Sequence, residues 1–214
     1  MSRKKRQAVK AQKLAERQAK QKKGFRQTKR TTDKWKKKTW FMVYAPKEFE
    51  NTEIAETVGE KPENLMGRVF IVSVRDLANQ MKKGHIYMRF KVNDIKGNKA
   101  YTESVGHYIR ESYLKRMTRR RSSKAEIVQD EQINGGKVRV KTVVLCARKV
   151  SGDKRADLNR IVSGMIAGAC KGQEYAKLID EFVFGTIPSK IFNEAKKVAP
   201  IKRIEIIKSQ FFKS

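Results

Sequence analysis

Polar and apolar residues alternate along the middle of the chain, and this period of two indicates β-strands. The stretch HIYMRFKVN is the clearest case, because every second residue is apolar: Ile86, Met88, Phe90 and Val92. The turn-forming residues DIKGN follow, so KAYTESV is expected to return as the paired strand. A second hairpin is predicted at Asn134-Gly135-Gly136, since tight hairpin turns need the positive φ angles that Asn and Gly adopt easily.

Three further apolar runs are typical of strands. The first, Trp40 to Tyr44, is ended by Pro46, and Trp40 is expected to belong to the core. The second, GRVFIVSVRDL, has apolar residues on both faces, which predicts a central strand covered on both sides. The third, IKRIEIIKSQFF, closes the chain.

Helical spacing begins at Gly106. The residues Ile109, Tyr113 and Met117 lie four apart, which predicts a helix from His107 to Arg121 with these three as its buried line. A shorter helix, DLANQMKK, is expected between a capping Asp76 and a terminating Gly84.

The last third of the chain is mostly helical in pattern. Asp153 precedes ADLNRIVSGMIAGACKG, whose apolar stripe is Leu158, Ile161, Val162, Met165 and Ala169. Two shorter helices, EYAKLIDEFVF and PSKIFNEAKKVA, follow, the second with Pro188 in its first turn. About seven strands and five helices without regular βαβ alternation predict an α+β fold, mainly an antiparallel β-sheet or barrel flanked by helices.

Charge changes this picture most at the N-terminus. The 214 residues carry 51 Lys or Arg against 22 acids, a formal net charge of +29. The first 39 residues hold 17 of these bases and two acids, and have few large apolar side chains before Trp35. Such a segment cannot pack a core. We therefore expect a basic tail over residues 1–39, disordered when free and ordered by RNA, and a single α+β domain over residues 40–214.

One segment runs against this charge. Between Glu48 and Glu63 the chain has six glutamates and one lysine, Lys61. We expect a surface excursion that faces away from any polyanion.

Catalytic and metal-binding signatures are weak. Cys146 and Cys170 have no C-x-x-C partner and lie far from His85 and His107, so two buried thiols in a reducing compartment are expected and no metal or cofactor is predicted. The trio of Ser104, His107 and Glu111 is expected to be a solvated helix start. The stretch GMIAGACKG lacks the phosphate-loop pattern, and its small residues are expected to allow close helix packing. The acids Asp130 and Glu131 are expected to be solvated beside a turn.

The chain also lacks membrane signals. No apolar run reaches the roughly 18 residues that span a bilayer, and the N-terminus MSRKKRQAVK lacks an apolar signal region. The chain is therefore expected to be intracellular, with a polyanionic partner. Nucleic acid is the commonest such partner, ahead of membrane surfaces and acidic proteins.

The strongest candidate contact is YLKRMTRRRSSK, which carries six cations and no acid. On the predicted helix, Arg116 and Arg120 share a face, with Arg119 adjacent, and guanidinium groups bind phosphate oxygens in two-bond geometry. A helix C-terminus attracts cations without a ligand, but this accounts for one or two arginines rather than six cations. We therefore favour phosphate contact.

Two other basic groups leave alternatives open. The alternating Lys137, Arg139 and Lys141 share a strand face that is either a phosphate contact or a solvated outer face. Trp35, set among lysines, either stacks on an unpaired base or anchors the tail against the domain. Nothing in the sequence indicates base-edge reading, so recognition of backbone and shape is expected.

Several segments, in order, resemble the S3Ae family of archaeal and eukaryotic small-subunit ribosomal proteins: KKKTWFMVYAPKEF, LMGRVFIVSVRDL, FKVNDIKGNKAYT and GHYIRESYLKRM leading into the NGG hairpin. The resemblance runs from about Lys36 to the C-terminus. Ile71 stands where eukaryotic members tend to carry an acid, so that position is assigned no role. The chain also lacks the long C-terminal extension of eukaryotic members, which indicates an archaeal member.

The resemblance implies a non-enzymatic structural protein of the small subunit's platform, near the mRNA exit, in the cytoplasm. Its implied partners are small-subunit ribosomal RNA and neighbouring small-subunit proteins, with mRNA and initiation factors as further candidates and no membrane. The alternative from charge alone is a DNA-compacting, chromatin-like protein. The predicted RNA-binding residues are Arg3, Lys4, Lys5, Arg6, Lys34, Trp35, Lys36, Lys37, Lys38, Lys115, Arg116, Arg119, Arg120, Arg121 and Lys124.

Overall fold

The structure, a computed structural model, describes residues 10, 12–13, 33–78 and 80–213. The chain divides into two units, Met1–Lys38 and Thr39–Ser214. The expected disorder or RNA-induced order of the tail concerns residues outside the described part, as do Arg3, Lys4, Lys5 and Arg6. In the first unit the description includes the 3₁₀ turn η1 (Lys34–Lys37), where the Asp33 carboxylate accepts a hydrogen bond from the Trp35 backbone N–H at 3.0 Å.

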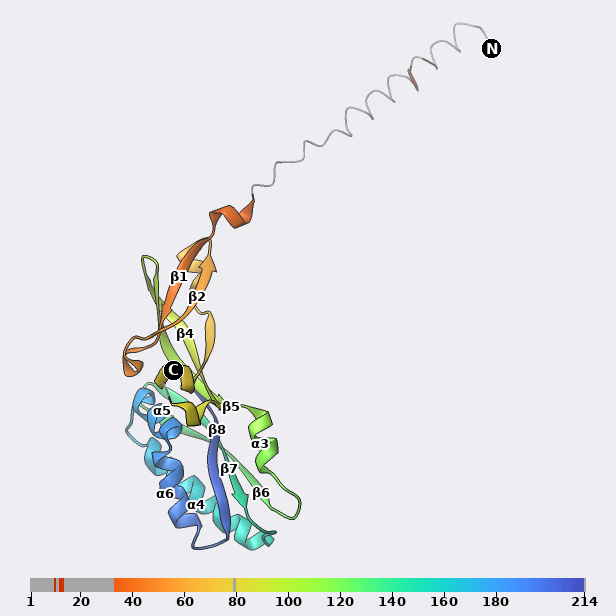
Figure 1. Ribbon diagram of the computed structural model, residues 1–214, viewed down its shortest axis with the longest axis vertical. Helices are drawn as coiled ribbons and strands as arrows, with labels where there is room; N and C mark the ends of the chain where they lie inside the picture. Colours follow the sequence, from red (N-terminus) through yellow and green to blue (C-terminus); the bar gives the residue numbers. More distant parts are fainter. Residues whose placement is uncertain (1–9, 11, 14–32, 79, 214) are drawn as a thin grey trace. The chain divides into compact units, whose positions relative to one another are not determined.

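The second unit is α+β, as predicted, and its described strands form one mostly antiparallel sheet (Figure 1). The eight strands are β1 (Thr39–Tyr44), β2 (Glu53–Gly59), β3 (Val69–Ser73), β4 (Ile86–Lys96), β5 (Lys99–Ile109), β6 (Lys124–Ile133), β7 (Gly136–Cys146) and β8 (Ile201–Lys213). They run in the order β2-β1-β5-β8-β7-β6, with β4 paired to β5 and β3 to β4, and the β1–β5 pair is parallel.

Strand β5 joins the two halves of the sheet. Its first residues pair with β1, its last residues pair with β8, and β4 runs along its other side for almost the whole length. A strand of eleven residues is long enough to serve two neighbours in succession. Because of this, residues near the C-terminal end of β5 lie between the β3–β4 pair and the β8–β7–β6 strands.

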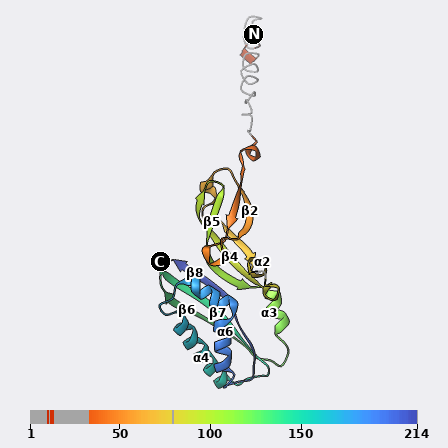
Figure 2. The same cartoon turned by 60° about the vertical axis from the view of Figure 1, so that its left-hand side comes forward.

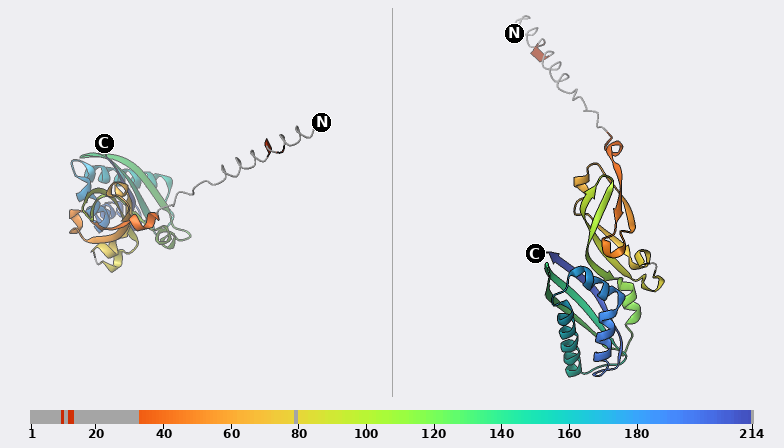
Figure 3. Two further views of the ribbon diagram at one scale, coloured as in Figure 1. Left: turned by 90° about the horizontal axis from the view of Figure 1, so that it is seen from above. Right: turned by 90° about the vertical axis from the view of Figure 1, so that its left-hand side faces the viewer.

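Three helices, α4 (Gly152–Cys170), α5 (Tyr175–Phe184) and α6 (Thr186–Ala195), cover one face of β6, β7 and β8 (Figures 2 and 3). They and the sheet share one large core, to which α4 contributes Leu158, Val162, Ile166 and Cys170. The much shorter α2 (Val74–Ala78) and α3 (Glu111–Met117) lie in the connections before β4 and after β5. The 3₁₀ turns η2 (Lys47–Phe49), η3 (Pro62–Leu65) and η4 (Met81–Lys83) complete the described elements.

Both predicted hairpins are confirmed. Strand β4 buries its alternate residues and turns into β5 at Gly97 and Asn98, and β6 turns into β7 at Asn134 and Gly135. Gly135 has a φ of 89°, the left-handed backbone that motivated this prediction. The closing strand and the three C-terminal helices are confirmed as well.

The prediction that GRVFIVSVRDL forms a central strand is wrong. Among the described strands β3 pairs with β4 alone, so it is an edge strand. Val69 and Ile71 are 43% and 54% exposed. Apolar residues on both faces of a short strand therefore did not mean that both faces are covered.

The core assignment of Trp40 is also wrong. Side chains alternate along β1, so Phe41 and Val43 are buried while Trp40 and Met42 are 62% and 43% exposed. The predicted surface excursion contains the edge strand β2, which pairs with β1 from Glu53 onward. Its glutamates are nevertheless exposed.

The helix predicted from His107 to Arg121 is only half confirmed, because its first residues belong to a strand and its last residues to a loop. The strand β5 continues to Ile109, because Tyr108 pairs with Tyr87 on one side and Lys208 on the other. Helix α3 covers only Glu111–Met117, and its buried residue is Leu114 rather than Tyr113 or Met117, which are half-buried. Strand pairing thus overrode the four-residue spacing.

His107 consequently lies in a buried strand position rather than at a solvated helix start. Its Nδ1 lies 2.7 Å from the Ser209 hydroxyl oxygen, and its Nε2 lies 3.0 Å from the Ile206 carbonyl oxygen, which therefore accepts the Nε2 proton. Burial lowers the pKa of His107 from 6.5 to about 4. Because the folded pKa is lower than the unfolded one, this histidine stabilises the fold above about pH 6.5 and loses that contribution as the pH falls toward 4.

Three smaller expectations are corrected. Helix α2 begins at Val74, so Asp76 lies inside its first turn instead of capping it. Gly164 and Gly168 face open space on α4, so they do not serve close helix packing. Asp130 is held in ion pairs rather than merely solvated.

Candidate nucleic-acid interface

The cations of the stretch YLKRMTRRRSSK are divided between a helix and a loop. Helix α3 ends at Met117, where Thr118 takes extended backbone angles and its hydroxyl donates to the Leu114 carbonyl oxygen at 3.0 Å. Lys115 and Arg116 therefore lie on the helix, whereas the exposed Arg119, Arg120 and Arg121 lie in the loop that leads to β6. Arg116 and Arg120 do not share a helix face, contrary to the prediction.

Ion pairs separate the basic residues into two groups. On the β6–β7 hairpin, Asp130 lies 2.7 Å from Arg139 and 3.1 Å from Lys137, and these hydrogen bonds hold the pKa of its carboxyl well below the usual range. Glu126 binds Lys124 and, at 2.6 Å, Lys141, which lowers its pKa to about 2. These four cations already have carboxylate partners in the sheet. For Lys137, Arg139 and Lys141, whose role the sequence left open, these ion pairs favour the solvated outer face over a phosphate contact.

The cations around α3 form the second group. In the described part of the chain, Arg110, Arg116, Arg119, Arg120 and Arg121 make no ion pair with an acid. Lys115 is a partial exception, since its ammonium lies 3.9 Å from Glu111 on an exposed helix face. Uncompensated guanidinium groups at the surface are the ones available to phosphate.

A row of polar side chains crosses the sheet beside α3. The register pairs Tyr87 of β4 with Tyr108 of β5, Tyr108 with Lys208 of β8, and Lys208 with Lys141 of β7. Directly paired residues of antiparallel strands point to the same face. Four side chains from four strands therefore form one continuous line, although they come from positions up to 121 apart in the chain.

This row is part of the lining of a groove of about 1030 Å³, with Leu114 and Lys115 of α3 contributing as well. The rings of Tyr87 and Tyr108 stack with centroids 5.4 Å apart and planes inclined by 16°. Arg110 donates a hydrogen bond to the Tyr87 hydroxyl and lies 5.0 Å from the centre of its ring. Arg89 adds a further cation, and neither it nor Lys208 has an acid partner among the described residues.

Sequence reasoning named Lys141 as one of three residues with an open role, but it missed Tyr87, Tyr108 and Lys208. The alternation in HIYMRFKVN places Tyr87 and Arg89 on the polar face of their strand, which was a usable signal. Lys208 lies 100 residues from Tyr108, and only the β5–β8 register brings them together.

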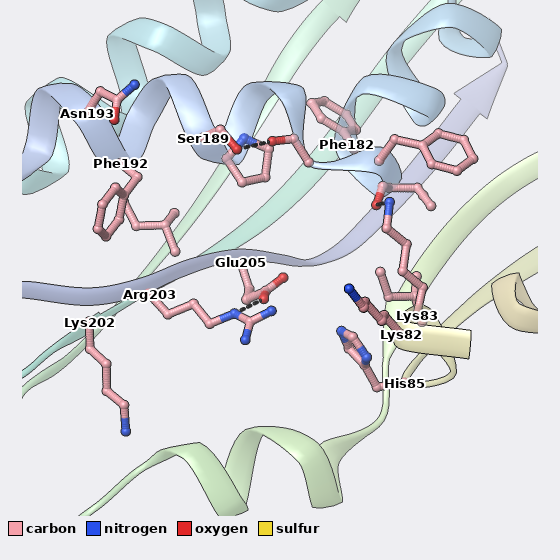
Figure 4. A pocket seen from close by; sticks show the side chains of 16 residues that line it. Lys82, Lys83, His85, Phe182, Ser189, Phe192, Asn193, Lys202, Arg203 and Glu205 are labelled. Atoms are coloured by element: carbon pink, nitrogen blue, oxygen red, sulfur yellow. Dashed lines mark hydrogen bonds and ion pairs between the residues drawn. The ribbon is translucent and has the colours of Figure 1, made fainter. Parts of the chain in front are cut away.

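A second basic depression, of about 620 Å³, lies between η4, α5, α6 and β8 (Figure 4). Lys82, His85, Lys202 and Arg203 line it. Burial, then the positive charge of Arg203, lowers the pKa of His85. Its ring stacks on Tyr113 of α3 with centroids 3.9 Å apart.

Two cations of this depression serve the fold. Figure 4 shows Arg203 linked to Glu205 and Lys83 reaching α5, where its ammonium donates to the Val183 carbonyl oxygen at 3.1 Å. Arg203 also lies 5.7 Å from the centre of the Tyr113 ring. The depression is therefore partly neutralised, because Glu205 compensates Arg203.

The described part of the tail presents an aromatic ring among lysines. Trp35 is 64% exposed, and the Lys38 ammonium lies 4.3 Å from the centre of its ring. Lys36 and Lys37 are exposed, and Lys34 begins η1.

The described residues contain no group of three or more side chains suited to hold a metal ion. Cys146 and Cys170 are free and buried, as predicted, and burial raises the pKa of Cys170 to about 11. Of the helices in the described ranges, none is long and apolar enough to cross a membrane.

A mostly antiparallel sheet with one helix-covered face and a groove lined by cations and aromatic rings is an arrangement suited to a polyanion. Comparison with known proteins makes this class specific. The model of the Ribosomal S3Ae family matches residues 26–214, so the chain belongs to this family of ribosomal proteins and is not an enzyme.

Its relatives agree. The chain is 37% identical over 198 residues to the small ribosomal subunit protein eS1 of Methanococcus vannielii, covering 92% of this chain and 89% of that protein. It is 36% identical over 198 residues to the eS1 protein of Methanococcus maripaludis, with 92% and 87% covered. It is 31% identical over 186 residues to that of Methanoculleus marisnigri, with 86% and 94% covered. The predicted family is confirmed, and these relatives are archaeal.

Proposed function

We propose that this protein is a structural constituent of the small ribosomal subunit in the cytoplasm, where it binds ribosomal RNA at the platform near the mRNA exit. The observation that supports it most is the cluster of guanidinium groups around α3 without carboxylate partners in the described chain, Arg110, Arg116 and Arg119 to Arg121. Membership in a ribosomal protein family supports the ribosome as the particle in which the protein works. RNA phosphates supply the missing negative charge.

The predicted residues take different roles in this proposal. Arg116, Arg119, Arg120 and Arg121 bind phosphate directly, and Lys115 assists them from the exposed side of α3. Lys124 contributes less, because Glu126 already holds its ammonium. Residues Arg3 to Arg6 and Lys34 to Lys38 extend the contact along the tail, where the exposed ring of Trp35 can stack on an unpaired base.

The outer face of β1 is the candidate surface for a neighbouring small-subunit protein. Trp40 and Met42 are exposed there, with Val58 and Glu56 of β2 directly opposite them. The segment from Glu48 to Glu63 borders this face and has a net negative charge, which repels RNA. A basic protein segment fits an apolar strip beside acids, so we assign the face to such a segment. mRNA and initiation factors are further candidate partners.

The test is a titration of the full chain with small-subunit ribosomal RNA and with duplex DNA of equal length, across a salt series. The proposal expects tighter binding to the RNA at every salt concentration. Equal affinity and equal salt slope for both would instead support the DNA-compacting protein.

A further inference from the structure

The groove beside α3 contains aromatic rings, which a surface that contacts only the phosphates of helical RNA does not require. Its lining includes two stacked tyrosine rings, Tyr87 and Tyr108, and both are half-buried. Around them stand Arg89, Arg110 and Lys208, which have no acid partner among the described residues. We propose that this groove binds one unpaired RNA nucleotide, with its base stacked at the Tyr87–Tyr108 pair and its phosphates held by these three cations.

The spatial order of the residues supports this assignment. The register places Lys208 directly beside Tyr108, and Arg110 reaches Tyr87 from the end of β5, so cations stand on both sides of the aromatic pair. A nucleotide offers the matching parts, because its flat base is attached to a ribose that carries phosphates on its 5′ and 3′ sides. Bases in unpaired RNA stack on aromatic rings and guanidinium planes.

The shape of the site favours a single nucleotide over a double helix. The groove holds about 1030 Å³, close to the upper end of the ~300–1,000 Å³ typical of small-ligand sites. Helical RNA presents its phosphates and sugars and keeps its bases stacked inside, so it cannot place a base against rings that line a groove. A bulged or looped-out base can. The exposed loop arginines suit the helical phosphates that flank such a bulge.

The electrostatics favour RNA over a peptide in the same groove. Glu126 is taken up by Lys124 and Lys141, and Glu111 lies near Lys115, so the two acids of the lining are already compensated. Arg89, Arg110 and Lys208 remain without an acid partner among the described residues, so the groove favours a ligand that carries negative charge. Base–aromatic stacking is tolerant of sequence, so the site selects an unpaired base rather than a particular one.

The proposal rests on the proposed function, because it names the RNA element that this surface takes. The test uses the full chain and two RNA stem-loops that differ by one bulged 2-aminopurine nucleotide. Tyr108→Leu removes the stack, Tyr108→Phe keeps it, and Arg110→Gln removes an exposed cation together with its contact to Tyr87, while both stacked rings remain. The matched control is Tyr101→Leu, since Tyr101 belongs to a second stacked pair, 6.0 Å from Tyr44, with Lys96 and Lys99 nearby and outside the groove.

We expect the wild-type chain to prefer the bulged RNA and to change the fluorescence of the bulged base. Tyr108→Leu should weaken binding to the bulged RNA by roughly 5- to 150-fold, the range for one lost base–aromatic stack, and abolish the fluorescence change. Binding to the fully paired stem should stay within about twofold. Tyr108→Phe and Tyr101→Leu should resemble the wild type, and Arg110→Gln should weaken bulge binding even if Tyr108→Leu does not fold.

Photo-cross-linking to small-subunit ribosomal RNA that carries 4-thiouridine tests the same site on the natural partner. Adducts on the peptides that contain Tyr87, Tyr108 or Lys208 would support the groove. If the chain binds ribosomal RNA but its adducts lie only on the tail and the arginine loop, and bulged and paired RNA bind equally, the groove proposal is wrong while the proposed function stands. No preference for ribosomal RNA over DNA would remove the proposed function itself.

Discussion

The loop arginines allow the sharpest test of which charges contact RNA. Arg119, Arg120 and Arg121 are exposed and make no ion pair within the described chain, so replacing all three with Gln removes three free cations and no internal contact. Each phosphate contact adds about 0.7 to 0.9 to the slope of log affinity against log salt. Three lost contacts therefore reduce the slope by roughly two to three, and weaken binding at 0.1 M salt by roughly 100- to 500-fold relative to the wild type, with convergence near 1 M.

The assay is fluorescence anisotropy with labelled small-subunit ribosomal RNA between 0.05 and 0.5 M KCl (about tenfold in salt, enough to fix a slope). The matched control replaces Lys137, Arg139 and Lys213 with Gln. It removes the same charge, but these cations already face Asp130 and Glu103 at 3.1, 2.7 and 3.7 Å. We expect only a small change of slope for the control.

Thermal unfolding separates binding from folding. The unfolding free energy of the variant with all three loop arginines replaced should differ from that of the wild type by no more than the ~0.5 kcal/mol typical of surface substitutions. An unchanged salt slope would refute phosphate contact by the loop. Equal reductions in both variants would show that net charge, rather than the loop, governs binding.

Four further predictions follow from single residues. The unfolding free energy measured in urea should fall by about 2 kcal/mol between pH 7 and pH 5, because His107 has a lower pKa in the folded than in the unfolded chain. His107→Asn should lose this part of the pH dependence. A folded pKa near 6.5 in an NMR titration would contradict the prediction. Cys146 and Cys170 should not react with a thiol reagent in the native chain, and rapid labelling would show that they are accessible. Trp40→Ala should leave the melting temperature almost unchanged, whereas a loss above about 2 kcal/mol would place Trp40 in the core. Gly106→Ala should destabilise the fold by about 1–3 kcal/mol in urea unfolding, because its methyl group would overlap the Ser209 carbonyl oxygen, and no effect would mean that β5 and β8 can separate there.

The sequence predicted the elements whose own residues decide them. Alternation in HIYMRFKVN fixed the faces of β4, and Asn134 with Gly135 fixed the β6–β7 turn. The apolar stripe of α4 was predicted correctly at Leu158 and Val162, but its buried line continues through Ile166 and Cys170, while Met165 and Ala169 are half-buried. The fold class came from the order of these elements.

It failed where a neighbour far along the chain decides the outcome. The spacing of Ile109, Tyr113 and Met117 predicted a helix, yet pairing with β4 and β8 makes residues 106–109 part of a strand. In TWFMVY all side chains from Trp40 on are apolar or aromatic, so composition alone does not say which ones face the core. The edge position of β3 depends on the absence of a second partner in the described sheet, which no local pattern records.

The candidate site shows the same division. The density of arginine before β6 was visible in the sequence, but not that α3 stops at Met117 and leaves three of them in a loop. Which cations are free depended on cross-strand register, since Asp130 lies opposite Arg139. The Tyr87–Tyr108–Lys208 row needed three strands to be aligned.

The central claim is that this protein is a stable part of the small ribosomal subunit. Sedimentation of a native lysate through a sucrose gradient, with immunodetection of the chain, tests it most directly. We expect the protein to migrate with the small subunit and to be released as salt is raised, because its contacts are made to phosphate. Finding it at the top of the gradient while intact small subunits sediment below would contradict the account.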